Sequence, residues 1–387
     1  MSTEVAIIGG GICGLTTAIA LENRGFEPTV YESTETYRPV GAGILLQTNA
    51  LSVLDSIGLA ARIEASGIEI DAVPFLSPDG SRLFGFDLAF ERDRFGHGFV
   101  AIHRAKLQEL LLDELETTVR TGMECVSVTE PETPTVAFSD GSTVSPDCVI
   151  GADGIGSAVR AEICPTAEPR PADCIAYRGL APAADLPGGT DPGFEVWGEG
   201  SFVGCSPLGD GRVYWYATAT GPVAPDGTAV DRKSALRQRF DAYPEPVPQL
   251  LASTAADGII VTPLADLAPL GRWSTGAVTL AGDAAHAMLP FVGQGAAQGI
   301  EDAAVLAAVL DAHETPAAAF KQYEQCRKSR AEGFVATSRR LGRLAAVDSA
   351  VGWRLRNLGI RLLPGKLSRR LRRQQAMPSR YQPASDR

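Results

Sequence analysis

The chain has 387 residues, of which 45% are hydrophobic and 21% are charged, and its formal net charge is −11. This length is sufficient for two substantial domains with buried cores. The acidic balance argues against general affinity for nucleic acid, which requires a basic surface. No apolar run reaches the roughly 18 residues that a helix needs to span a bilayer, so we expect no transmembrane segment.

The N-terminal segment predicts a site for a dinucleotide. We expect a buried parallel strand at residues 5–8, a helix at 12–24 and a second strand at 28–31. The turn after the first strand carries three glycines in the spacing G-x-G-x-x-G, namely Gly9, Gly11 and Gly14. They permit a tight turn and close approach of the backbone to a pyrophosphate, which the helix N-terminus favours. Glu32 follows the second strand and can accept hydrogen bonds from both ribose hydroxyls. Its presence argues against the alternative that the glycine turn serves only to pack the helix on the sheet.

Two later segments each combine a strand with an acidic turn. In the first, residues 148–160, a hydrophobic strand is followed by Asp153, Gly154, Ser157 and Arg160. In the second, residues 278–286, a strand is followed by Gly282 and Asp283. Most Asp-Gly pairs are simply turns, and an Asp before an apolar run is often a helix N-cap, so each segment alone has an ordinary structural explanation. The glycine turn alone does not distinguish NAD from FAD.

Taken together, the three motifs resemble those of the p-hydroxybenzoate hydroxylase-like, class A FAD-dependent monooxygenases. Further family elements follow in the same order along the chain: residues 41–44, 49–50, Arg104, Pro290, 293–295 and 301–302. The resemblance extends over residues 5–302. It implies an α/β fold with a Rossmann-like FAD-binding domain, a mostly antiparallel β-sheet substrate domain and a C-terminal helical segment.

The resemblance assigns the following residues to FAD binding: Gly9, Gly11, Gly14, Glu32, Gly43, Arg104, Asp153, Gly154, Gly282, Asp283, Pro290, Gly293 and Gly295. Asp283 would accept the ribityl hydroxyls, because a carboxylate only accepts hydrogen bonds. Asp153 and Arg160 resemble residues that hold the pyrophosphate region and the reducing nucleotide. Arg104 resembles the arginine that reaches the FAD phosphates or the ribityl chain. The helix after Pro290 would point its amide groups at the flavin pyrimidine.

The expected domains are discontinuous: FAD binding at residues 1–67, 98–174 and 268–312, substrate binding at 68–97 and 175–267, and a C-terminal helical segment at 313–387. We expect a helix at residues 51–65, a hairpin within 68–90 and an antiparallel meander at 126–144. Four segments separated by Gly and Pro are expected to form the substrate sheet: 175–180, 193–197, 202–206 and 213–218.

The expected substrate site lies between this sheet and the flavin, because pockets form preferentially at domain interfaces. Its candidate lining residues are Phe202, Tyr214, Tyr216 and Pro290. Successive residues of a strand face opposite sides, so these aromatic residues could instead pack against outer helices. Residues 200–206 lack the cation with which family members grip anionic substrates, although Arg178 and Arg212 remain candidates for that task. We therefore expect a largely apolar substrate.

The resemblance implies an FAD-dependent monooxygenase that consumes NAD(P)H and O2 and hydroxylates a small, aromatic or largely apolar organic substrate. Oxygen would add to the reduced flavin at C4a, and this hydroperoxide would attack the substrate, so no side chain is assigned a catalytic role. Only one G-x-G-x-x-G unit is present, so NADH or NADPH is expected to bind transiently. Three alternatives remain: an epoxidase of an alkene or isoprenoid, a prenyl reductase that uses no oxygen, and a non-catalytic protein that binds a lipidated partner.

The cysteine and histidine patterns do not indicate a metal site. Seven cysteines are scattered singly, with no C-x-x-C or Cys/His cluster, which favours a reducing, cytoplasmic location. His286 is the lone histidine of an alanine-rich segment. We expect it to be a packed, hydrogen-bonded side chain without a catalytic role.

The C-terminal region is basic although the chain is acidic. Between Arg327 and Arg373 there are fourteen Lys or Arg and two acids, Glu332 and Asp348. A continuous helix is expected at residues 320–346. A basic segment of this kind can contact a membrane surface, but we expect it to lie against its own acidic protein with its cations solvated, because the C-terminal helix of the family that the chain resembles commonly braces the substrate domain.

Overall fold

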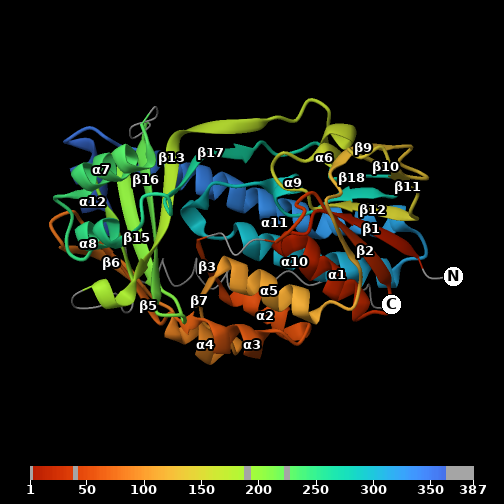
Figure 1. The fold of residues 1–387 in the computed structure, drawn as a ribbon, viewed down its shortest axis with the longest axis horizontal. Coiled ribbons are helices and arrows are strands. Elements are labelled where there is room, and N and C mark those ends of the chain that lie inside the picture. Colours follow the sequence, from red (N-terminus) through yellow and green to blue (C-terminus); the bar gives the residue numbers. More distant parts are fainter. Residues whose placement is uncertain (1–2, 38–41, 187–192, 222–226, 363–387) are drawn as a thin grey trace.

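The computed structural model describes residues 3–37, 42–186, 193–221 and 227–362. The fold is mixed α/β and has two halves, each built on one large sheet (Figure 1). In Figure 1 the parallel sheet lies on the right and the antiparallel sheet on the left. The long helix α11 (Pro316–Ala345) contacts strands of both sheets and so connects the two halves.

The parallel half is a six-stranded sheet with the order β18-β19-β12-β1-β2-β8. Its strands are β1 (Glu4–Ile8), β2 (Glu27–Glu32), β8 (Val119–Thr121), β12 (Cys148–Gly151), β18 (Ser274–Thr275) and β19 (Val278–Leu280). Residues 5–8 and 148–151 are all buried, so both faces of the sheet are covered, as the run of Val and Ile predicts. The helices α1 (Ile12–Glu22) and α10 (Gly295–Ala312) pack against each other beside this sheet.

Smaller elements surround the parallel sheet. The meander expected at residues 126–144 is confirmed as β9 (Cys125–Thr129), β10 (Thr135–Phe138) and β11 (Thr143–Val144). A second small sheet has the order β3-β7-β4, and its strands are β3 (Gly43–Leu46), β4 (Ile68–Glu69) and β7 (Val100–His103). The remaining short helices of this half are α4 (Ala89–Phe95), α5 (Arg104–Glu114), α6 (Ala158–Ile163) and α9 (Asp283–His286), with the 3-10 turn η2 (Pro290–Val292).

The prediction of a single helix at residues 51–65 is wrong. The structure has two helices there, α2 (Thr48–Ser56) and α3 (Ala60–Ser66). Gly58 lies between them with a φ of 82°. This left-handed conformation, which glycine adopts without penalty, ends the first helix and redirects the chain before the second one begins.

The antiparallel half is a seven-stranded sheet with the order β17-β13-β16-β15-β14-β5-β6. Its strands are β5 (Ala72–Leu76), β6 (Arg82–Asp87), β13 (Pro169–Pro182), β14 (Phe194–Trp197), β15 (Ser201–Pro207), β16 (Arg212–Thr220) and β17 (Ile260–Leu267), with the 3-10 turn η1 (Ala183–Asp185) after β13. The four expected strands and the hairpin are confirmed. Because β13 runs without interruption through residues 174–175, the domain boundary placed there stays a prediction.

The outer face of the antiparallel sheet is covered by helices. Val203 and Trp215 pack there against α7 (Ala229–Phe240) and α8 (Val247–Ser253), which lie at the left of Figure 1. The indole Nε1–H of Trp215 donates to Thr254 Oγ1 at 2.7 Å. Trp215 therefore belongs to the outer core and not to a substrate pocket.

The helix expected at residues 320–346 is confirmed as α11, and three of its cations, Arg327, Arg330 and Arg339, pair with buried acids. Arg339 of α11 donates to Asp266 Oδ1 at 2.7 Å, and Arg170 of β13 donates to the same oxygen at 2.9 Å. Asp266 is fully buried. This ion pair attaches α11 to the antiparallel sheet. The last described helix, α12 (Gly352–Arg361), packs against β6, and no helix of the described ranges is long and apolar enough to cross a membrane.

Replacing Asp266 by Asn should destabilise the fold, because Arg170 and Arg339 would lose the charge that they share. We expect the free energy of unfolding, measured by chemical denaturation, to fall by about 2 kcal/mol. The control is Asp210→Asn: Asp210 pairs with Arg212 at an exposed turn, so its replacement should cost at most about 0.5 kcal/mol. Equal losses in the two variants would contradict the role assigned to Asp266.

Candidate active site

Strand pairing brings the three sequence motifs together. β1 pairs with β12 and β12 pairs with β19, all in parallel. Their carboxyl ends therefore meet at one edge of the sheet, which is where ligands bind in open α/β sheets. The turns at Gly9, Asp153 and Gly282 follow these three strand ends. The convergence expected from the sequence is observed.

The glycines of the first turn serve different structural needs. Gly9 has a φ of 105°, and a Cβ on it would lie 2.4 Å from the carbonyl oxygen of Ala152. A Cβ on Gly14 would lie 1.9 Å from the carbonyl oxygen of Gly9, so α1 packs directly on the turn. A Cβ on Gly11, in contrast, would meet no atom within 4 Å. Gly11 therefore borders open space at the N-terminus of α1, where an anion is stabilised.

Glu32 ends β2 and reaches back to the glycine turn. Its Oε2 accepts the N–H of Gly10 at 2.7 Å, and its Oε1 accepts the N–H and hydroxyl of Thr34 at 2.8 and 2.6 Å. Burial alone would raise the pKa of Glu32, but these hydrogen bonds lower it below its usual range, so the side chain is a carboxylate. Each oxygen of a carboxylate can accept two hydrogen bonds, which leaves Oε2 capacity for a ribose hydroxyl.

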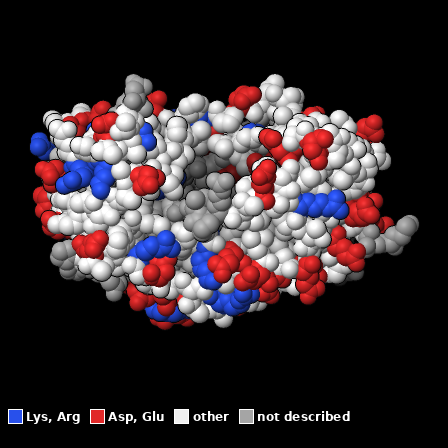
Figure 2. Space-filling model, in the orientation of Figure 1, with Lys and Arg blue, Asp and Glu red and all other residues white. Residues whose placement is uncertain are grey.

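Asp283 and Arg104 lie close enough for their charges to interact. Asp283 opens α9 after Gly282, whose φ of 58° is in the left-handed region. Asp283 is exposed, yet burial raises its pKa, and the charges of His286 and Arg104 partly offset this effect. Figure 2 shows that the surface of the molecule is hollowed between its two halves. Arg104, at the start of α5, is exposed as well.

The second motif contains an acceptor that the protein does not satisfy. Asp153 Oδ2 accepts the N–H of Val159 at 3.2 Å, whereas its buried Oδ1 has no hydrogen-bond partner among the described residues. Burial raises the pKa of Asp153, and a Cβ on Gly154 would meet no atom within 4 Å. A buried acceptor beside open space fits a site that receives a ligand donor. Arg160 points inward instead and donates to the carbonyl oxygen of Ala284 at 3.2 Å, so it ties the second motif to the third.

A buried ion network supports the turn that carries Asp283. Asp302 Oδ2 of α10 accepts the N–H of Gly282 at 2.8 Å and lies 2.6 Å from His286 Nε2. Its Oδ1 accepts from Arg327 Nε of α11 at 2.7 Å. Burial would raise the pKa of Asp302, but His286 and Arg327 outweigh it and lower the pKa to about 2. The carboxylate therefore keeps its charge and fixes the turn, and His286 is packed and hydrogen-bonded as expected.

Buried amides hold the segment at residues 290–293. Gln47 Nε2 donates to the carbonyl oxygens of Val292 and Gly293, both at 3.0 Å. Gln294 Nε2 in turn donates to Gln47 Oε1 at 2.5 Å. The segment at residues 290–293 is thus held by Gln47 and Gln294, which lie far apart in the sequence.

The first turn of α10 has no side-chain cap. The helix begins at Gly295, after the turn opened by Pro290 and after Gly293, whose φ is 63°. The N-terminus of an 18-residue helix carries partial positive charge and free N–H groups. These groups suit the electron-rich pyrimidine edge of a flavin.

Arg327 and Gln47 were not predicted from the sequence to support the site. Arg327 was counted only as one cation of a basic segment, and Gln47 precedes a helix without belonging to a motif. One signal was available: Tyr323, Arg327 and Arg330 follow at intervals of four and three, which places them on one helix face. That spacing does not reveal their partners, such as Glu301, which accepts from Arg330 at 2.9 Å.

The inner face of the antiparallel sheet is aromatic and meets the turn opened by Pro290. Phe202 and Tyr216 belong to one apolar cluster with Phe291. The ring centroids of Phe202 and Phe291 are 5.5 Å apart. Phe202, Tyr216 and the neighbouring Tyr214 lie on this inner face, so none of the three packs against α7 and α8 as Trp215 does.

Gly43 lies where the two halves touch. A Cβ on Gly43 would lie 2.5 Å from the ring of Tyr214. The contact between β3 and β16 therefore leaves no room for a side chain. Packing explains this glycine, which had been assigned to cofactor binding.

A partly buried acid on the inner face was not anticipated. Glu195 of β14 is opposite Gly204 of β15, which is opposite Tyr216 of β16. Because Gly204 has no side chain, the ring of Tyr216 crosses it and the hydroxyl donates to Glu195 Oε1 at 2.6 Å. Trp197 Nε1–H donates to Oε2 at 2.9 Å. Burial raises the pKa of Glu195, these two hydrogen bonds lower it only in part, and no cation of the described ranges pairs with it.

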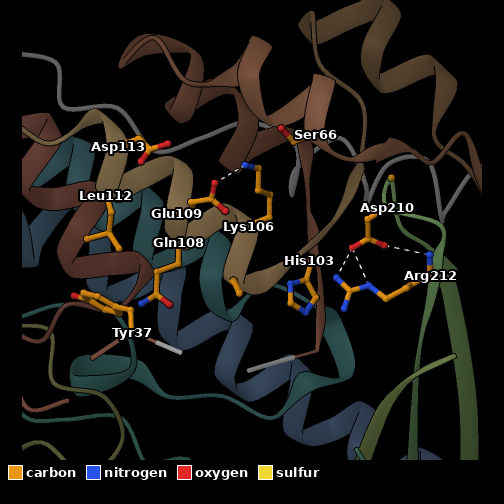
Figure 3. Close-up of a pocket in the computed structure, with 12 residues that line it drawn as sticks. Tyr37, Ser66, His103, Lys106, Gln108, Glu109, Leu112, Asp113, Asp210 and Arg212 are labelled. Atoms are coloured by element: carbon orange, nitrogen blue, oxygen red, sulfur yellow. Dashed lines mark hydrogen bonds and ion pairs between the residues drawn. The ribbon is translucent and has the colours of Figure 1, made fainter. Parts of the chain in front are cut away.

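A separate cavity of 610 Å³ opens beside the glycine turn (Figure 3). Tyr37 and Gln108, which line it, both donate to the carbonyl oxygen of Gly10 at 3.2 Å. The charged residues around it pair with each other: Lys106 with Glu109, and Arg212 with Asp210. None of the residues assigned to FAD or substrate lines this cavity. Arg212, considered as a cation for the substrate, lines this cavity and is paired with Asp210.

Comparison with known proteins decides the family. A family model described as an FAD binding domain matches residues 2–338. The chain belongs to the class A FAD-dependent aromatic monooxygenases. It is 34% identical over 365 residues to aurachin C monooxygenase/isomerase from Stigmatella aurantiaca, with 93% of this chain and 94% of the relative covered. It is 32% identical to 2-heptyl-3-hydroxy-4(1H)-quinolone synthase from Pseudomonas aeruginosa, with 95% and 96% covered.

The fold of this monooxygenase is similar to solved structures of the family. The crystal structure of Klebsiella pneumoniae HpxO complexed with FAD and uric acid matches with a TM-score of 0.87 and 27% identity, covering 97% of this chain and 96% of that one. The predicted fold class, the dependence on FAD and the monooxygenase activity are confirmed. NAD(P)H is the usual reductant in this family.

The pKa of Asp302 determines how the monooxygenase should respond to acid. The pKa is about 3.9 in an unfolded chain and about 2 in the fold. The ionised side chain therefore contributes stability, on the order of 2 kcal/mol, that is complete above about pH 4 and is lost as the pH falls towards about 2. Asp302→Asn should be less stable at neutral pH and should lose less on acidification, as measured by urea denaturation at several pH values. The exposed Asp348→Asn should keep the full acid dependence, and an unchanged dependence in Asp302→Asn would contradict the network.

Proposed function

We propose that this monooxygenase hydroxylates a neutral aromatic compound that carries an apolar substituent and a hydrogen-bond donor, such as a ring N–H or a phenolic O–H. The observation that supports this substrate class is Glu195, a partly buried acid on an aromatic surface. A carboxyl group there disfavours a carboxylate substrate and favours a donor. The name of one relative, 2-heptyl-3-hydroxy-4(1H)-quinolone synthase, describes a ring with such a donor and an alkyl chain.

Arg178, which lies beside Tyr216 in the sheet, is already engaged by the protein. Arg178 is opposite Tyr216 in the sheet and donates to Thr262 Oγ1 at 3.3 Å. Burial raises the pKa of Tyr214 to about 12, and the charge of Arg178 partly offsets this effect, so the two side chains are close. Arg178 thus supports the wall formed by the tyrosines and does not neutralise Glu195.

Tyr216 can connect the substrate to Glu195. Its hydroxyl donates to Glu195, so its oxygen lone pairs are left to accept a donor from the substrate. Burial and the nearby Glu195 hold the pKa of Tyr216 well above its usual range, so the tyrosine is protonated at rest. If the substrate proton moves to the Tyr216 oxygen while the tyrosine proton moves to Glu195, the ring gains electron density and becomes easier to hydroxylate.

The residues at the converging turns are proposed to hold FAD, which supplies the chemistry of oxygen activation when bound. Asp283 would accept ribityl hydroxyls, Glu32 would accept a ribose hydroxyl, and Gly11 would leave room for the pyrophosphate. The unsatisfied Oδ1 of Asp153 supports a ligand on the same side. The apolar inner face of the sheet would exclude water from the reacting ring.

The donor of electrons is proposed to be NADH or NADPH, bound transiently, with O2 as the second substrate. We also propose a cytoplasmic location, because all seven cysteines are free thiols in the structure. The acidic net charge of −11 makes nucleic acid an unsuitable partner.

Removing the proposed FAD contacts should weaken flavin binding. Asp283→Ala should raise the dissociation constant of FAD by about tenfold, because a charged acceptor is lost. Gly11→Ala should raise it as well, because the new methyl group enters the open space. Gly333→Ala is the matched control, since a Cβ there also meets no atom within 4 Å but lies in α11. Flavin fluorescence titration of the apoprotein measures the effect, and unchanged affinity in both site variants would sink the assignment.

The substrate class is tested by measuring how strongly each candidate substrate stimulates the oxidation of NAD(P)H. Oxygen uptake and the mass of the product are measured in the same reactions. Neutral phenols and N-heteroaromatic compounds with alkyl chains should stimulate more than hydroxybenzoates, and the product should gain one oxygen. Glu195→Gln should lower kcat/KM for the neutral compounds by about 10- to 100-fold, whereas the exposed Glu199→Gln should not. A preference of the native enzyme for benzoates, or full activity of Glu195→Gln, would overturn the proposal. Oxidation of NAD(P)H without oxygen uptake would indicate a reductase instead.

A further inference from the structure

The helix α12 and its flanks carry an exposed apolar stripe. Val351, Leu355, Leu358 and Leu362 follow at intervals of four, three and four residues, which places them on one helix face. They are 68%, 62%, 52% and 74% exposed. Of the nine large hydrophobic residues that are exposed in the described ranges, four form this stripe, and a fifth, Leu344, lies at the end of α11. Such concentration of exposed apolar residues marks an interaction surface.

The opposite side of α12 is firmly attached to the antiparallel half. Arg356 donates to the carbonyl oxygen of Gly198 at 2.7 Å, and Asn357 donates to the carbonyl oxygen of Trp197 at 3.0 Å. Ile360 is buried in the same apolar cluster as Trp197. The orientation of α12 is therefore fixed by polar and apolar contacts, and the stripe is its true outer face.

Cations border the apolar stripe. Four exposed arginines lie in α12 or at the end of α11: Arg340, Arg343, Arg354 and Arg361. The sequence continues with five more Lys or Arg between residues 363 and 373. From residue 333 to 362 the sequence contains one acid, Asp348. This basic, apolar surface belongs to a chain whose net charge is −11, so its charge is a local feature.

We propose that α12 and the adjoining end of α11 bind peripherally to an anionic lipid bilayer. The stripe would enter the interfacial region, and the bordering arginines would contact lipid phosphates. Charge favours this occupant over a second copy of the chain, because a symmetric dimer through the stripe would bring identical cations face to face. A helix of ten residues is too short to span the bilayer, so the contact is superficial and reversible.

The position of α12 indicates how membrane binding would serve the enzyme, because this helix lies next to residues of the proposed substrate pocket. Its inner side packs on Trp197, which shares an apolar cluster with Phe202 and donates to Glu195. In Figure 1, α12 lies at the outer end of the antiparallel half, away from the parallel sheet. An apolar substrate dissolved in the bilayer would therefore meet the protein close to the proposed pocket. This last step rests on the proposed function, whereas lipid binding does not.

Sedimentation of the FAD-loaded, full-length protein with vesicles tests the proposal. Vesicles of phosphatidylcholine with roughly 30% phosphatidylglycerol should bind the protein, neutral phosphatidylcholine vesicles should bind it much less, and salt should weaken the binding. Leu355→Ser with Leu358→Ser should lower the fraction bound to anionic vesicles by about tenfold. The control is Val230→Ser, because Val230 is also 68% exposed but lies in α7; it should leave binding unchanged.

Three outcomes would overturn the proposal. The protein could fail to bind anionic vesicles at low salt, the stripe variant could bind as well as the native protein, or the native protein could be a dimer that the stripe variant turns into a monomer. The flavin absorbance of each variant verifies that it is folded. Because the readout is binding, it stands even if the substrate proposed above is wrong.

Discussion

The buried charge of Asp302 is the interaction on which the site depends. A carboxylate without contact to water is stable only when cations and donors surround it, and here Arg327, His286 and the N–H of Gly282 do so. Asp302 itself belongs to α10, and its partners come from α11 and from the turn and short helix α9 that carry Asp283. One charge thus holds three segments in place, and loss of any partner would leave it uncompensated inside the protein.

The antiparallel sheet contributes through its two different faces. Trp215 and Tyr216 are neighbours in the chain, but alternation along the strand sends them to opposite sides. Trp215 closes the core under α7 and α8, whereas Tyr216 crosses Gly204 and reaches Glu195. Because Gly204 has no side chain, the hydrogen-bonded pair of Tyr216 and Glu195 lies within an otherwise aromatic surface. This pair distinguishes the surface from a purely apolar pocket.

The FAD half was largely predictable because its signals are local. The strand, the glycine turn and the following helix lie within one short window, and their spacing reflects backbone geometry alone. Local signals also misled: the apolar spacing at residues 51–65 continues across Gly58, but the conformation of that glycine ends the helix. The cations of the basic C-terminal segment were expected to be solvated, but Arg339 pairs with the buried Asp266, and the apolar outer face of α12 was not anticipated either.

By itself the sequence determined the family, the FAD motifs and the order of most strands along the chain. These features depend on glycine conformation and side-chain alternation, which act between residues that are near neighbours in the sequence. Tertiary structure alone decided which polar groups meet. Gln47 and Gly293 are 246 residues apart, and Arg327 and Asp302 are 25 apart on different helices. Glu195 and Tyr216 lie on strands separated by a third one. No local pattern encodes these partners, because strand pairing and helix packing over the whole chain bring them together.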